Sequence, residues 1–202
     1  INTDGVFVSV AHVFDEKVGY EYRGRLPEEL YKPYLEIKEL ARDDENDIFI
    51  GKIDMQKTPF FGIDSQEPEL GRSVCVGGYP MAALQRNKMG GMDHGGVRRY
   101  YQPSFILDKV TTRASTPQGK MRTHNGFLVR DAGLFGMSGG PVFDTLGFIV
   151  GMQGSVASRV SQSGTKSIAV ENAQVIKSAL ITNTLERAGQ KFKYRSILNS
   201  LF

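Results

Sequence analysis

Short runs of β-branched and aromatic residues, separated by turns that contain glycine and proline, recur along most of this 202-residue chain. We expect strands at 5–10, 47–53, 72–79, 104–112, 125–130, 140–144, 146–153 and 166–170. Apolar residues recur at helical spacing over 171–188, which predicts a helix near the end of the sequence. Because strands do not alternate with helices, the pattern favours an all-β barrel architecture and disfavours βαβ folds.

The composition is that of an ordinary globular protein, with 40% apolar and 23% charged residues. The net charge of +3 is too small to indicate a nucleic-acid or membrane partner. No segment approaches the roughly 20 apolar residues that span a bilayer. The one cysteine, Cys75, excludes an intrachain disulfide, and its apolar neighbours predict a buried strand residue. These features leave the cellular compartment unassigned.

One glycine-rich motif, Gly136-Met137-Ser138-Gly139-Gly140-Pro141, suits a nucleophilic serine. The backbone must turn sharply there and aim its N–H groups at one point, which glycines permit. By itself the motif also fits a hairpin turn, or the Gly-x-Ser-x-Gly elbow of α/β-hydrolases. In α/β-hydrolases the base histidine follows the serine, whereas His12, His94 and His124 all precede Ser138. The α/β-hydrolase interpretation therefore lacks its base.

Two residues upstream supply the missing partners. His12 follows the predicted strand 5–10, and Asp47 opens the predicted strand 47–53. Each is an ordinary packing or turn residue when taken alone. Together with Ser138 they give the chain order His, Asp, Ser, which is the order of the trypsin-like triad.

The chain resembles the chymotrypsin-like family at Ala11-His12, at Asp47-Ile48 and at the serine motif. Within that family it is most similar to the high-temperature-requirement (Deg) proteases. The stretches that carry this closer resemblance are Gly62–Ser65, Leu70–Val74, Gly77–Pro80, Gly147–Met152 and Ser167–Val170. The aspartate that precedes the serine in animal enzymes is replaced by Met137, so activation through its salt bridge is not implied.

The resemblance implies two six-stranded-type antiparallel β-barrels followed by a C-terminal α-helix. Residues 1–62 would form the N-terminal barrel with the histidine and aspartate, and 63–170 the C-terminal barrel with the nucleophile. Residues 171–202 would form the helix and a basic tail. Because only eleven residues precede His12, we expect the first barrel to be incomplete or unusually built.

The implied activity is that of a serine endopeptidase working through an acyl-enzyme, with a protein or peptide as substrate. Ser138 would attack the scissile carbonyl, His12 would act as general base and then acid, and Asp47 would hold the imidazole tautomer. The N–H groups of Gly136 and Ser138 would bind the oxyanion. No cofactor or metal is expected, because His94 and His124 lack a cluster of acidic or cysteine ligands.

The resemblance also places a specificity pocket, formed by Ala132, Gly133, Leu134, Phe135, Gly154, Ser155 and Val156. The carboxylate of trypsin-type pockets falls near Ala132, so we expect no preference for lysine or arginine and a preference for small or medium apolar residues. A shift of register by one residue would bring Asp131 into the pocket and reverse this expectation. The backbone of 154–156 would pair with the substrate as an added strand.

Three alternatives stay open. The first is a viral-type polyprotein protease of the same fold. Such enzymes often recognise a glutamine or glutamate of the substrate with a histidine on the strand after the nucleophile, and this chain has Gln153 at that place. A binding module that has lost activity is disfavoured because all three triad residues are present. A latent protease could be controlled by a partner through a surface loop at 85–101 or through the basic tail 190–202. Assembly into a homo-oligomer also stays open, because the oligomeric state is not assigned.

Overall fold

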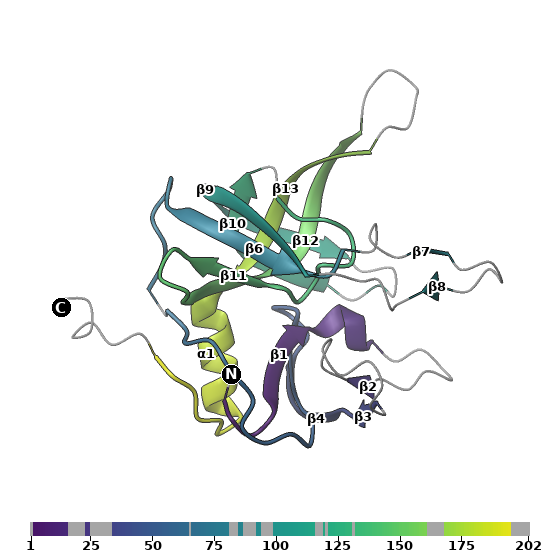
Figure 1. Ribbon diagram of the computed structural model, residues 1–202. Helices are drawn as coiled ribbons and strands as arrows, with labels where there is room; N and C mark the ends of the chain where they lie inside the picture. The colour runs from purple at the N-terminus through teal and green to yellow at the C-terminus, as the bar shows by residue number, and fades with distance from the viewer. Residues whose placement is uncertain are drawn as a thin grey trace.

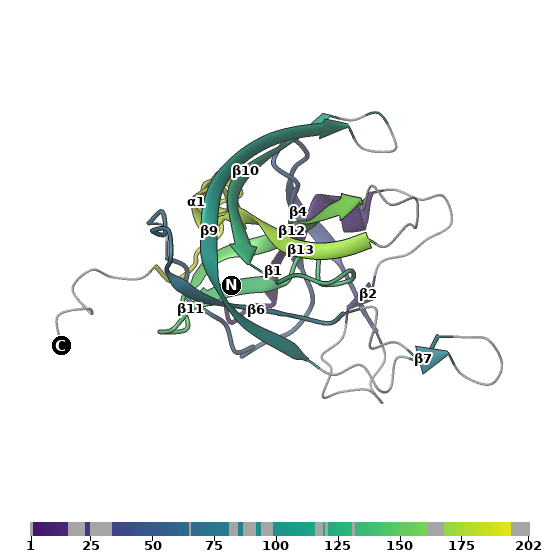
Figure 2. The ribbon, with the colours of Figure 1, turned by 90° about the horizontal axis from the view of Figure 1, so that it is seen from above.

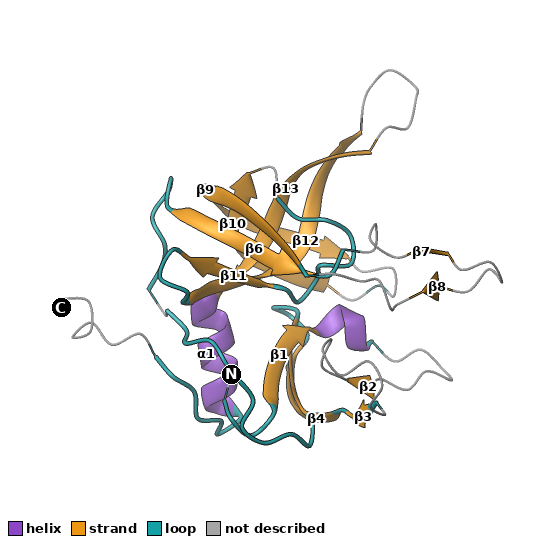
Figure 3. Cartoon of the chain, in the orientation of Figure 1, coloured by secondary structure: helices purple, strands orange, loops and turns teal. Residues whose placement is uncertain are grey.

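The computed structural model describes residues 2–15, 23–24, 34–64, 66–80, 85–86, 92–93, 99–115, 119, 121–130, 132–160 and 168–194. Strands dominate these residues, and the α-helix α1 stands near the C-terminal end (Figure 3). The all-β architecture predicted from the sequence is confirmed.

The C-terminal half is a closed antiparallel barrel with strand order β10-β13-β12-β11-β6-β9 (Figures 1 and 2). Its strands are β6 (Ser73–Gly78), β9 (Tyr100–Ser115), β10 (Met121–Arg130), β11 (Pro141–Asp144), β12 (Ile149–Val160) and β13 (Ile168–Lys177). Buried valines such as Val76 and Val129 alternate with outward-facing neighbours and fill its core. Gly126 permits the closest strand contact, because a Cβ there would lie 1.7 Å from the carbonyl oxygen of Val175.

The described part of the N-terminal half forms an open sheet of strand order β1-β5-β4. Its strands are β1 (Val6–Val10), β4 (Lys38–Asp43) and β5 (Ile48–Lys52), with the 3-10 helix η1 (Ala11–Phe14) directly after β1. Two short hairpins pair β2 (Arg23–Gly24) with β3 (Leu35–Glu36), and β7 (Gln85–Arg86) with β8 (Met92–Asp93). In the described residues this sheet has three strands and does not close into a barrel.

The helix α1 (Ser178–Arg187) lies beside the open sheet and below the barrel (Figure 1). Its buried residues Ile181 and Leu185 join one apolar cluster with Ile50 of the sheet and Ile176 of the barrel. This shared core holds the two halves together.

The prediction of helix from residue 171 was wrong, because 171–177 belong to strand β13. Ala173 and Val175 alternate into the barrel core and pair with both β10 and β12. Ala173 and Val175 had been counted toward the helical periodicity, although their spacing of two also fits a strand. Pairing with neighbouring strands, and not the local pattern, decides the structure here.

Cys75 was predicted to be buried, but it is only partly buried on β6 and is a free thiol. Desolvation raises the pKa of this thiol above its ordinary value. Most of the predicted loop 85–101, and the tail beyond Tyr194, lie outside the described residues. In the described part of the chain, no helix is both long and apolar enough to cross a membrane.

Candidate active site

His12 and Asp47 form a hydrogen-bonded pair at the end of the open sheet. Strand register pairs Val10 with Ile48, which brings the following η1 turn beside the residue that precedes β5. The Nδ1 atom of His12 lies 2.7 Å from Asp47 Oδ2. Because a carboxylate can only accept, Nδ1 carries the hydrogen, and Nε2 of a neutral ring keeps a free lone pair. In that state, Nε2 is the ring atom that can accept a hydrogen bond.

Backbone contacts fix the orientation of this pair. The His12 N–H donates to Asp47 Oδ1 at 2.8 Å, and the Ala11 N–H donates to the Asp47 carbonyl oxygen at 3.1 Å. Asp47 has φ 59°, a left-handed conformation that aspartate tolerates better than most residues. Its side chain is 7% exposed, against 34% for His12. The carboxylate is thus held inside the protein while the imidazole reaches solvent.

The serine motif occupies the turn between β10 and β11. Gly136 and Gly139 have φ 90° and 85°, which is the conformation that favours glycine. The Met137 N–H donates to the carbonyl oxygen of Leu134 at 3.1 Å, and the Gly139 N–H to that of Gln153 at 2.8 Å. Among the described residues, the N–H groups of Gly136 and Ser138 have no such acceptor. Two free donors therefore flank Met137, as an oxyanion site requires.

The serine turn packs against the strand that leads to His12. A Cβ on Gly139 would lie 2.3 Å from Ser9 Oγ, so only glycine fits at this position without a shift. Ser138 is half-buried and forms no side-chain hydrogen bond with His12 or with any other described residue. The structure thus places the serine turn against β1 but does not join the serine to the histidine directly.

A polar pocket of about 410 Å³ lies next to the His12–Asp47 pair. On its wall, His124 Nε2 lies 2.7 Å from Ser155 Oγ, and Ser155 Oγ donates to Gln174 Oε1. Burial lowers the pKa of His124; the nearby Asp47 carboxylate opposes this shift, whereas His12 and Arg122 add to it. His124 is therefore a neutral hydrogen-bonding residue at pH 7.

Arg122 shares this pocket and reaches across to the sheet. Its Nη1 lies 3.2 Å from Asp47 Oδ1, and its Nη2 lies 3.1 Å from Asp15 Oδ2. Sequence reasoning missed Arg122 and set His124 aside. The available signal was their spacing of two on one strand, which places both on the same face of β10.

The predicted specificity residues are divided between several environments. Gly154 and Ser155 line the polar pocket beside His12. Ala132 is 1% exposed in the barrel core, and a Cβ on Gly133 would lie 2.7 Å from Ala173 Cβ. The remaining three differ in exposure: Leu134 packs partly against the core, Phe135 is 56% exposed and Val156 is half-buried. A pocket lined by all seven residues stays a prediction.

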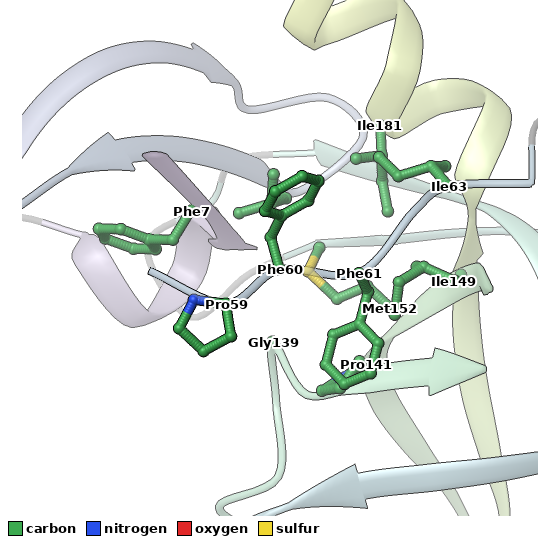
Figure 4. Close-up of a pocket in the computed structure, with 12 residues that line it drawn as sticks. Phe7, Pro59, Phe60, Phe61, Ile63, Gly139, Pro141, Ile149, Met152 and Ile181 are labelled. Atoms are coloured by element: carbon green, nitrogen blue, oxygen red, sulfur yellow. The ribbon is translucent and has the colours of Figure 1, made fainter. Parts of the chain in front are cut away.

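Two further features bear on chemistry. In the part of the chain that the structure describes, no group of three or more His, Cys, Asp or Glu side chains is arranged to hold a metal ion. A second pocket, of about 180 Å³, is lined by apolar residues such as Phe7, Phe60 and Met152 (Figure 4). The lining of this second pocket has no ionisable side chain.

A family model for the trypsin-like peptidase domain matches residues 1–152. The chain belongs to the trypsin-like peptidase family. No curated protein matches it. Among solved structures, this trypsin-like domain is similar to the active form of the Rv3671c protease from M. tuberculosis, with a TM-score of 0.65 and 18% identity over 95% of this chain and 72% of that one.

A second similar structure is the HtrA-type protease AlgW with a decapeptide. The TM-score is 0.58 at 18% identity, over 93% of this chain and 49% of the AlgW chain. The inactive form of Rv3671c matches with a TM-score of 0.63 and 18% identity, over 92% of this chain and 80% of that one. The predicted resemblance to trypsin-like proteases is therefore confirmed, and the chain shares its fold with an HtrA-type protease.

Proposed function

We propose that this chain is a serine endopeptidase that cleaves peptide bonds through an acyl-enzyme intermediate. The observation that carries the proposal is the 2.7 Å contact between His12 Nδ1 and the buried Asp47 carboxylate, in a chain whose Ser138 turn packs on the histidine strand. Membership of a peptidase family supports it independently.

In the proposed reaction, Ser138 Oγ attacks the scissile carbonyl carbon and His12 Nε2 takes its proton. The imidazolium that forms is stabilised by Asp47 and then gives the proton to the leaving amine. Water attacks the resulting ester in the second half, with His12 again as base. The absence of a Ser138–His12 hydrogen bond is compatible with this scheme, because such contacts often tighten only when substrate binds.

The free N–H groups of Gly136 and Ser138 are the proposed oxyanion donors. One donor of this kind is worth roughly 2.7–4 kcal/mol in comparable enzymes. They point to acyl transfer because charge develops on the carbonyl oxygen in the tetrahedral intermediate. The substrate would lie extended along the backbone of 154–156, and we propose small or medium apolar residues before the cleaved bond.

A fluorophosphonate probe tests the nucleophile and base directly, because it reacts with an activated serine whatever the peptide specificity. The intact protein should be labelled, and Ser138→Ala and His12→Ala should not. Ser73→Ala, which changes an exposed serine on β6, is the matched control and should be labelled like the intact protein. Labelling that persists in Ser138→Ala, or a folded intact protein that is never labelled, would contradict the proposal.

A further inference from the structure

Arg122 connects the closed barrel to the catalytic carboxylate of the open sheet. It lies near the start of β10, yet its guanidinium contacts Asp47 and Asp15 of the N-terminal half. Its side chain is only 12% exposed. A charged group so deeply buried needs partners of opposite charge, and these two carboxylates supply them.

The contacts at Asp47 divide the two carboxylate oxygens between different donors. Oδ1 accepts from the His12 backbone N–H at 2.8 Å and faces Arg122 Nη1 at 3.2 Å, whereas Oδ2 faces His12 Nδ1 at 2.7 Å. Rotation of the carboxylate would break the contacts at Oδ1. Arg122 therefore acts on the oxygen that does not bind the imidazole, and so fixes the one that does.

The guanidinium has the right shape for this task. Its planar fork places Nη1 on Asp47 and Nη2 on Asp15, which a lysine ammonium on a flexible stem does not reproduce. Asp15 is itself held, since Arg42 Nη1 lies 3.6 Å from its Oδ1. Arg42 also donates to the Phe14 carbonyl oxygen at 3.0 Å, within the turn that carries His12.

We infer that Arg122 is a positioning residue for the reaction proposed above, holding Asp47 so that Oδ2 faces His12 Nδ1. This inference rests on the proposed function. It makes the acid–base pair of the sheet depend on a strand of the barrel. The docking of β10 does not depend on Arg122 alone, because the Thr123 N–H donates to the Glu45 carbonyl oxygen at 2.7 Å. Variants at Arg122 should therefore keep the fold.

The first test compares Arg122→Gln, Arg122→Lys and the control Arg187→Gln, which removes a 69% exposed arginine that faces Asp43. We expect Ser138 in R122Q to react with a fluorophosphonate about 10- to 100-fold more slowly, the loss typical of a misplaced catalytic group. R122K should recover part of the rate, because the positive charge returns without the fork. R187Q should react like the intact protein.

The second readout is the low-field proton resonance of His12 Nδ1–H, which requires no activity. It should broaden or shift in R122Q and recover partly in R122K. A role limited to fold stability would lower the melting temperature but leave this resonance in place at temperatures where the variant is folded. If R122Q does not fold, Asp15→Asn is the variant to test, because it removes the second carboxylate that the Arg122 guanidinium contacts. We expect its rate of labelling to fall less than that of R122Q.

The two proposals fail in distinguishable ways. If the intact protein is labelled, and R122Q or D15N matches it in both rate and resonance, Arg122 is not a positioning residue and the serine peptidase proposal stands. If the folded intact protein is never labelled, the serine peptidase proposal fails. The resonance of His12 Nδ1–H then tests only whether Arg122 holds Asp47 in place. A change of this resonance in R122Q supports that role, and an unchanged resonance overturns it.

Discussion

The two halves of the molecule carry the site in different ways. The barrel that holds Ser138 is closed, so each of its six strands has two neighbours. The sheet that carries His12 and Asp47 has only three strands in the described residues, with β1 and β4 at its edges. The pair on the sheet depends on local strand register, whereas the serine turn is supported by a complete barrel.

The two halves also differ in whether their apolar core is self-contained. The barrel encloses its own apolar cluster, but the isoleucines of β5 share a cluster with barrel residues and with α1. On the other face of the sheet, Phe14 stacks on Phe49 with ring centroids 4.0 Å apart. Because a few strands are stable only when packed against another element, we conclude that the sheet depends on the barrel and helix for its stability.

The largest expected effect is on the acid–base pair. Asp47→Asn should keep the fold, because asparagine also tolerates a left-handed φ, but should lower kcat by about 10⁴-fold through the wrong imidazole tautomer. Peptide hydrolysis measures kcat, and circular dichroism shows whether the fold is kept. Asp43→Asn on the same hairpin is the control and should stay active. Activity of D47N within tenfold of the intact protein would show that this pair does not drive the reaction.

The closure of the barrel can be broken at Gly126. Alanine there would place a methyl group 1.7 Å from the Val175 carbonyl oxygen, so β10 and β13 would have to separate. We expect a loss of more than about 4 kcal/mol in the free energy of unfolding, measured with urea. Gly77→Ala is the control, because its Cβ would meet its nearest atoms at 3.4 Å. Equal stability of the two variants would contradict the tight strand contact.

The dependence of the sheet on the helix can be tested with Leu185→Ala. Leu185 is fully buried in the shared cluster, and its truncation should cost about 2–5 kcal/mol. Native-state hydrogen exchange should show this loss for amides of both β5 and β12. The control is Leu146→Ala, at a residue that is 65% exposed. Weakened protection confined to one half would mean that sheet and barrel unfold separately.

The smallest effect concerns pH. Burial places the pKa of His124 below the ordinary value of 6.5, so the unfolded state takes up this proton at higher pH than the folded state. His124 therefore makes stability fall as pH drops below about 6.5. Melting temperatures from pH 8 to pH 5 should fall less steeply in His124→Asn than in the intact protein. Parallel curves would contradict the buried, neutral state of His124.

Local sequence was sufficient where local physics decides the structure. The three candidate catalytic residues and most strands were visible, since glycine-flanked Ser138 and the β-branched runs are short-range signals. The helical stretch failed at 171–177, where pairing with β10 and β12 selected a strand. Arg122 was missed and His124 was set aside. Their spacing of two indicated one shared strand face, but it did not indicate which distant residues that face contacts.

Closure of the barrel has a consequence for the order in which the structure assembles. The strand that completes it, β13, is the last strand in the described residues and pairs with both β10 and β12. During translation His12 and Asp47 leave the ribosome before the serine turn, and that turn has no closed support until β13 has emerged. Until β13 has paired with both of its neighbours, the barrel cannot close and the serine turn lacks its support.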